Sequence, residues 1–279
     1  MPRQFTPGQL IDRGKRPPHV NLPLIALALL LALMVACRPE ATPTPGAKPP
    51  GLTGDFFPLQ VGMRWQYDTT VYGSSSGPRT ASSTVAVCRV RDTENNGRLY
   101  LLSTCAEEDL IQAQFLAVDG VTVTEPLVVN REGDPKPRQP ASIIARTDMR
   151  IGQAWRWEGL LDGDAWRGFY RVANLGKVWT PAGEFNAVRL IVNEGHPGAI
   201  SFEPGPHVQT TANEGFAGTV ERWYAPGVGL VKESGLAIVP NGEGGSARIE
   251  LTRVLRQYGS VDVALIPCCQ KFDSLIGAR

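Results

Sequence analysis

The sequence predicts an all-β fold, and three kinds of pattern carry that prediction. Glycine and proline are abundant, with 30 and 23 residues among 279, and they separate short apolar runs. Within several runs apolar and polar residues alternate, as they do in a strand with one buried face. Asn-Gly and Asp-Gly pairs stand between runs, and such pairs favour the tight turns of β-hairpins. We therefore expect antiparallel strands joined by hairpins, with at most one or two short helices.

The first predicted strand covers residues 63–71. Its odd positions are Met, Trp, Tyr, Thr and Val, whereas its even positions are Arg, Gln, Asp and Thr. Side chains alternate between the two faces of a strand, so this order places the large apolar residues on one face. We expect that face to be buried.

The second and third predicted strands, 82–91 and 98–105, flank an Asn-Gly pair at 96–97. A two-residue turn there places Cys88 opposite Cys105 in a non-hydrogen-bonded pair, with Cα atoms about 4.5 Å apart. A disulfide tolerates that distance. We predict a Cys88–Cys105 disulfide if the compartment is oxidising, and two reduced cysteines if the host keeps its envelope reducing.

The rest of the chain continues the same pattern. Residues 107–114 are the one convincing candidate for a short helix. Further predicted strands are 115–118, 121–124, 142–146, 154–160, 165–173, 177–180, 184–192, 219–224, 229–234 and 247–258. Residues 130–140 and 195–218 are predicted loops, and Gly227 is expected to supply the positive φ of a type II turn. Since no period of about 20 to 50 residues repeats, a propeller or solenoid is disfavoured.

The N-terminal region predicts export. A basic stretch precedes residues 22–36, which are apolar apart from one proline and too few for the roughly 20 residues of a transmembrane helix. The following Met-Val-Ala-Cys at 34–37 resembles a lipobox, in which a cysteine receives a diacylglyceryl group before cleavage. We predict that residues 1–36 form a lipoprotein signal peptide and that Cys37 is lipidated. The alternative is an uncleaved anchor helix.

The predicted lipid anchor leads into a tether, residues 37–54, which is rich in proline and threonine and has little to bury. A β-rich domain is expected over 55–258, followed by a C-terminal tail, 259–279. We therefore expect the protein on the outer side of the cell membrane or at the outer membrane. The net charge of +1 gives no electrostatic reason to expect nucleic acid or an anionic membrane surface as a partner.

Three stretches carry a resemblance to known proteins: FFPLQVGMRWQYD at 56–68, TPAGEFNAVRLIV at 180–192 and ERWYAPGVGLVKESG at 221–235. They resemble a group of bacterial envelope proteins related to the LolA/LolB-like superfamily of lipoprotein carriers. The resemblance implies a strongly curved antiparallel sheet that forms an incomplete barrel. Its concave side is expected to hold an acyl chain or another apolar ligand. The resemblance supplies no catalytic residue.

Candidate reactive residues are few. Gly-Ser-Ser-Ser-Gly at 73–77 matches the letters of a nucleophile elbow, but β-patterned residues follow where that motif needs a helix. His196 and His207 could join Glu194 or Glu203 around a metal, although two loop histidines are more often solvated, and no zinc motif is present. We therefore expect no catalytic residue, metal or cofactor, and a hydrolase is the least favoured reading.

Two further features leave alternatives open. Cys268 and Cys269 could form a vicinal disulfide, pair with another chain or stay free. Four tryptophans could line an apolar groove for a lipid-like ligand or fill the barrel interior, namely Trp65, Trp155, Trp157 and Trp166.

The leading functional hypothesis is a non-enzymatic, lipid-anchored envelope protein. It would touch the membrane through its N-terminal lipid and bind an apolar ligand or the acyl chain of a lipoprotein. The alternative is a scaffold that contacts another envelope protein through its sheet edges and the loop at 195–218.

Overall fold

β-strands make up most of the described chain. In this computed structural model the described residues are 52, 54–73, 77–93, 97–106, 109–197, 217–240 and 246–271. Their strands are β1 (Met63–Gly73), β2 (Arg79–Asp92), β3 (Arg98–Ala106), β4 (Asp109–Asp119), β5 (Thr122–Val129), β6 (Pro135–Arg146), β7 (Ala154–Leu161), β8 (Asp164–Thr180), β9 (Gly183–Gly195), β10 (Ala217–Ala225), β11 (Gly229–Pro240) and β12 (Ser246–Ser260). A 3-10 turn, η1 (Val263–Leu265), and a helical turn at 267–271 follow. The all-β prediction is confirmed.

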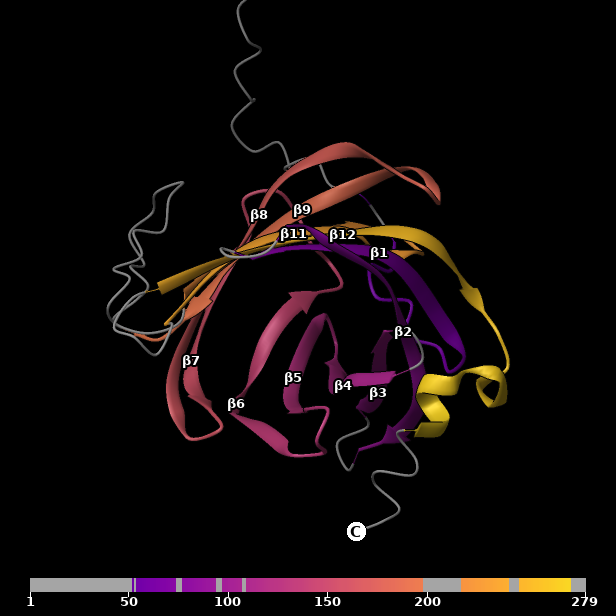
Figure 1. Cartoon of the computed structure of the whole chain (residues 1–279), viewed down its shortest axis with the longest axis horizontal. Helices are drawn as coiled ribbons and strands as arrows, with labels where there is room; N and C mark the ends of the chain where they lie inside the picture. Colours follow the sequence, from indigo (N-terminus) through magenta and orange to yellow (C-terminus); the bar gives the residue numbers. More distant parts are fainter. Residues whose placement is uncertain are drawn as a thin grey trace, which may run out of the picture. The chain divides into compact units, whose positions relative to one another are not determined.

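The strands form one antiparallel barrel. Each strand pairs with the next along the chain, and β12 closes the ring by pairing with β1 (Figure 1). The sheet thus closes further than the incomplete barrel that the resemblance implies.

One pair of neighbouring strands in the barrel wall has few paired residues. β6 and β7 pair only at Arg138↔Leu161 and Gln139↔Leu160. Close approach here depends on Gly159, since a Cβ at this position would lie 2.6 Å from the carbonyl oxygen of Gln139. The β6–β7 junction is therefore held by far fewer backbone hydrogen bonds than the β8–β9 hairpin, which is paired from Arg167 to Thr180.

Alternation along the strands separates an interior from an exterior. Trp65 and Tyr67 on β1 are buried in the interior cluster, as the pattern of the first predicted strand indicates. On β2, Val85 lines the interior cavity, whereas its neighbour Ala86 packs in a second cluster with Ile266 of the C-terminal segment. The described part of the predicted tail is therefore packed against the outside of β2–β4.

Two disulfides join the barrel to this segment. Cys88 bonds to Cys269 and Cys105 bonds to Cys268, with Cα–Cα distances of 5.2 and 5.8 Å. The predicted Cys88–Cys105 disulfide is therefore wrong. Each of the two adjacent cysteines of the tail bonds to a different strand instead of to its neighbour.

The register of the β2–β3 hairpin explains this error. A two-residue turn was expected, but the Thr93 N–H donates to the Gly97 carbonyl (2.9 Å) and closes a longer loop. A β-bulge then takes Cys88 out of the ladder, and Cys105 pairs with Thr84. Both cysteines are thereby free to bond to the segment that covers them.

The short helix predicted at 107–114 is also wrong, because residues from Asp109 onward belong to β4. This strand is hydrogen-bonded to β3 on one side and β5 on the other, and pairing on both sides outweighs local helix propensity. A hairpin joins β4 to β5 as predicted, but its turn residues are Gly120 and Val121, because Asp119 pairs with Thr122. The predicted positive φ of Gly227 is confirmed, at 71° between β10 and β11.

Several predictions concern residues outside the described ranges. They are the signal peptide 1–36, the lipidated Cys37, nearly all of the tether 37–54, residues 74–76, and residues 198–216 with Glu203 and His207. They stay predictions. Within the described ranges, no helix is both long enough and apolar enough to cross a membrane.

Candidate functional site

The interior of the barrel holds a cavity of about 580 Å³. All twelve strands contribute to its lining, with Trp65, Val85, Leu102, Gln112, Glu125, Arg138, Leu161, Trp166, Glu194, Arg222, Glu233 and Arg253 as one example from each, in chain order. Since the lining comes from the whole ring, the cavity exists only when the barrel is closed. It lies within the range of about 300–1,000 Å³ that is typical of small-molecule sites.

One part of the lining is apolar. Its members pack together in the interior core cluster, and we call them the apolar wall: Phe57, Leu59, Trp65, Val85, Leu102, Leu116, Ile144 and Leu230. The indole N–H of Trp65 donates to the Val228 carbonyl, so this polar atom is satisfied within the protein. The apolar wall can therefore contact an apolar group without leaving that donor unpaired.

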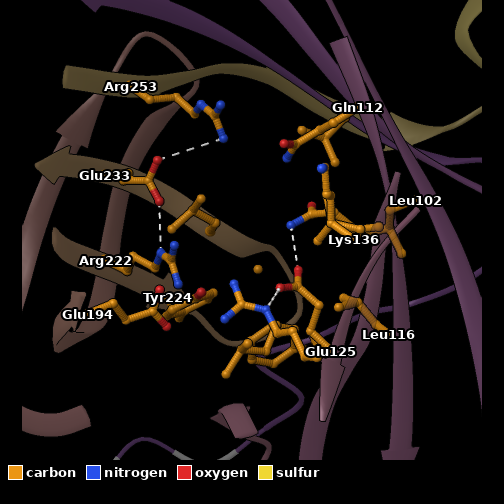
Figure 2. Close-up of a pocket in the computed structure, with 18 of the residues that line it drawn as sticks. Leu102, Gln112, Leu116, Glu125, Lys136, Glu194, Arg222, Tyr224, Glu233 and Arg253 are labelled. Atoms are coloured by element: carbon orange, nitrogen blue, oxygen red, sulfur yellow. Dashed lines mark hydrogen bonds and ion pairs between the residues drawn. The ribbon is translucent and has the colours of Figure 1, made fainter. Parts of the chain in front are cut away.

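Charged side chains form another part of the lining. Figure 2 shows Arg222, Glu233 and Arg253 on one side of the cavity, with Glu125 and Lys136 on the opposite side. Lys136 forms an ion pair with Asp162, and both side chains are partly exposed. The deeper charges are buried, and each of the deeper carboxylates has a partner of its own.

Glu233 on β11 lies between two arginines and its side chain is only 9% exposed. The Nε of Arg222 donates to its Oε2 (2.8 Å), and the Nη1 of Arg253 lies 3.8 Å from its Oε1. Burial alone would raise the pKa of Glu233, but the charges of Arg222 and Arg253 outweigh burial and lower that pKa. Glu233 is thus held in its ionised form.

Glu125 on β5 has one arginine and one amide as partners, and its side chain is 4% exposed. Its Oε2 lies 2.8 Å from the Nε of Arg138, and its Oε1 accepts from the Nε2 of Gln114 (2.8 Å). Burial raises the pKa of Glu125, and the charge of Arg138 offsets only part of that rise. The environment of Glu125 therefore favours its protonated form more than the environment of Glu233 does.

A third carboxylate, Glu194 on β9, accepts a hydrogen bond from the hydroxyl of Tyr170. The same hydroxyl lies 3.1 Å from the Oγ of Ser142. Burial, followed by the charge of Glu194, raises the pKa of Tyr170 well above its ordinary value. Tyr170 is therefore a fixed neutral donor to Glu194.

The four predicted tryptophans do not share one surface. Trp65 and Trp166 line the cavity. Trp157 is buried beside the β6–β7 junction, where its indole donates to the Pro140 carbonyl (2.9 Å). Trp155 stacks on Tyr170 with ring centroids 5.4 Å apart and donates to the Ile143 carbonyl (2.8 Å). The groove interpretation thus fits two of the four, and the packing interpretation fits the other two.

Of the residues considered for a metal, His196 and Glu194 both line the cavity. The ring of His196 makes an edge contact with Trp166, with centroids 4.8 Å apart. In the part of the chain that the structure describes, no three His, Cys, Asp or Glu side chains are grouped as a metal site would require.

Sequence reasoning missed the buried charges. Residues 130–140 were expected to form a surface loop, but Pro135 begins β6 and the Arg138 side chain is 11% exposed. Prolines are tolerated there because β6 has few ladder bonds to β7. One sequence pattern could have revealed these charges, namely a charged residue on the buried face of a strand whose residues alternate. Glu233 is an example, because it stands two residues after the buried Val231.

Comparisons with known proteins give distant likenesses in fold. No protein family profile and no curated protein matches the chain. One similar solved structure is a candidate lipoprotein from Parabacteroides distasonis ATCC 8503, with 12% identity and a TM-score of 0.38. Another is a candidate exported protein with a YmcC-like fold from Bacteroides fragilis NCTC 9343, with 12% identity and a TM-score of 0.39. Each match covers 75% of this chain and 100% of the other. Likenesses at this level transfer no function.

Proposed function

We propose that this protein is a lipid-anchored envelope protein whose barrel binds a small amphipathic molecule in its interior. The observation that carries the proposal is the cavity of about 580 Å³, which combines the apolar wall with buried charged groups. A free lipid and the acyl chain of a lipoprotein both belong to this ligand class.

A purely apolar ligand suits the cavity less well. Filling the interior with hydrocarbon would remove Glu125, Glu233 and their arginines from any remaining water, and desolvating charged groups is costly even when they are paired. A molecule with a polar head avoids that cost, because its head can hydrogen-bond to the charged groups while its chain covers the apolar wall. The lining thus favours an amphipathic ligand over the apolar one expected from the sequence.

The sequence supports a place for such binding. Lipid on Cys37 would keep the domain at a membrane surface, and a proline-rich tether would hold it clear of the head groups. Amphipathic molecules are concentrated at that surface. The proposal therefore joins the sequence prediction of location to the chemistry of the cavity.

The test uses residues 49–279, which form a compact unit of their own. We expect native mass spectrometry to find a co-purifying amphipathic molecule, and a fluorescent fatty acid to bind and be displaced. Leu116→Trp places extra bulk in the cavity and should weaken that binding at least tenfold. Ile111→Trp is the matched control, because Ile111 lies on the same strand with an exposed side chain.

Thermal unfolding of both variants checks that they fold. The proposal fails if no lipid co-purifies and no fatty acid binds, or if the two substitutions affect binding equally.

A further inference from the structure

We infer that the charged part of the cavity is an anion subsite, in which Arg138 and Arg253 bind the carboxylate or phosphate head of the ligand. This inference rests on the proposed function and narrows it from amphipathic molecules in general to anionic ones.

The first support is a pair of buried donors without acceptors. The Nη1 of Arg138 and the Nε of Arg253 are fully buried and have no hydrogen-bond partner among the described residues. The Arg138 and Arg253 side chains are 11% and 21% exposed, and both line the cavity. A buried donor without a partner costs free energy, so an acceptor that reaches either donor would be stabilising.

The second support is that the acceptors of the cavity are already engaged. Glu233 accepts from Arg222, Glu125 accepts from Gln114, and Glu194 accepts from Tyr170. Among the described residues, no carboxylate of the lining has a buried oxygen without a partner. On these charged side chains it is therefore donors that lack acceptors, and not the reverse. Oxyanions are the strongest acceptors for guanidinium groups.

The third support is that both guanidinium groups are held in place by aromatic rings. The Arg138 guanidinium lies 5.4 Å from the ring centroid of Trp157, and that of Arg253 lies 5.4 Å from the ring centroid of Tyr67. Stacking of this kind orients the planar donor group and reduces the entropy lost when a ligand binds. The subsite is thus preorganised.

The balance of charge agrees with this assignment. Arg138, Arg222 and Arg253 line the cavity together with Glu125, Glu194 and Glu233, and burial raises the pKa of Glu125. Where Glu125 is protonated, the three arginines outnumber the ionised carboxylates among these six side chains. An anionic head group would restore neutrality.

The experiment compares ligands that share one chain and differ in the head. Residues 49–279 are titrated by calorimetry with dodecanoate, dodecyl phosphate, dodecanol and dodecyltrimethylammonium, each below its micelle concentration. We expect the two anions to bind at least tenfold more tightly than the alcohol, and the cation to bind most weakly. The ratio of the two anion affinities tells which oxyanion is preferred.

Arg253→Gln then tests the named group. Glu233 keeps its hydrogen bond from Arg222, so this variant leaves no carboxylate without a partner. We expect the affinity for the anions to fall about tenfold or more and that for dodecanol to stay within twofold. Arg256→Gln is the matched control, since Arg256 lies on the same strand with an exposed side chain, and it should change neither affinity. If Arg253→Gln does not fold, Arg253→Lys takes its place, because it keeps the charge and loses the Nε donor.

The outcomes separate the two proposals. If none of the four ligands binds, the proposed function fails, and the anion subsite fails with it. The anion subsite is wrong if all four ligands bind with similar affinity. It is also wrong if the Arg253 variant weakens the binding of dodecanol as much as that of the anions. In both cases the cavity still binds apolar chains.

Discussion

The two sides of the cavity shift the pKa values of similar carboxylates in opposite directions. Glu233 and Glu125 are both almost completely buried, and each has an arginine Nε at 2.8 Å from one of its oxygens. Yet the pKa of Glu233 is lowered, whereas that of Glu125 is raised. At Glu233 the charges of Arg222 and Arg253 outweigh burial. At Glu125 the charges of Arg138 and Arg222 offset only part of the rise, because the negative charge of Glu194 adds to the effect of burial. The balance of all the nearby charges, and not one arginine partner alone, decides whether burial or attraction prevails.

The two shifts give opposite pH dependences of stability. The lowered pKa of Glu233 means that its ionised form stabilises the fold above the ordinary carboxyl value of 4.5, and this contribution is lost as the pH falls through the lowered pKa. The raised pKa of Glu125 means that its protonated form stabilises the fold below 4.5, and this contribution is lost as the pH rises through the raised pKa. Lowering the pH therefore removes the stabilising contribution of Glu233 and increases that of Glu125.

Removing the charge of Glu233 should have the largest effect. Glu233→Gln leaves the partly buried Arg222 and Arg253 without their carboxylate, and we expect a loss of about 3–5 kcal/mol in the free energy of unfolding at pH 7. Urea unfolding followed by tryptophan fluorescence measures it. Glu250→Gln, at an exposed ion pair, should cost less than about 1 kcal/mol. A loss below about 1 kcal/mol for Glu233→Gln would contradict the comparison.

Removing the arginine on the other side should cost less. Arg138→Gln leaves Glu125 with Gln114, and we expect a loss of about 1–3 kcal/mol at pH 8. Protonated Glu125 carries no charge and does not need the missing arginine, so the loss should be smaller towards pH 5. Unfolding curves at both pH values measure this. A loss that does not vary with pH would show that the charge state of Glu125 is not involved.

The smallest effect is expected for Glu125→Gln. The amide resembles the protonated acid, which the raised pKa already favours, so stability should change by less than about 1 kcal/mol. The variant should also flatten the dependence of unfolding free energy on pH above 4.5. A loss as large as that of Glu233→Gln would mean that Glu125 is held ionised, and the contrast between the two sides would disappear.

The comparison also marks what could be predicted from the sequence. Strands and hairpins were predictable where alternation is local, as in β1 with its inward Trp65 and Tyr67, and where a turn needs a glycine, as at Gly227. The charged cavity could not be predicted from the sequence. The partners of Glu233 come from β10 and β12, and their proximity depends on the register of the barrel. The bulge at Cys88 is a similar case, since one extra residue in a strand changes which cysteines can meet.

Some parts of the barrel wall are held together more strongly than others, and this difference bears on how a ligand enters the cavity. The two disulfides fasten the C-terminal segment across β2 and β3, whereas β6 and β7 share only two paired positions. Local opening of a protein begins where backbone hydrogen bonds are fewest, so among the described strands amide hydrogen exchange should be fastest at the β6–β7 junction. Arg138 lies in that junction. One of the two residues that we assign to the ligand head group thus belongs to the part of the wall that we expect to open most readily.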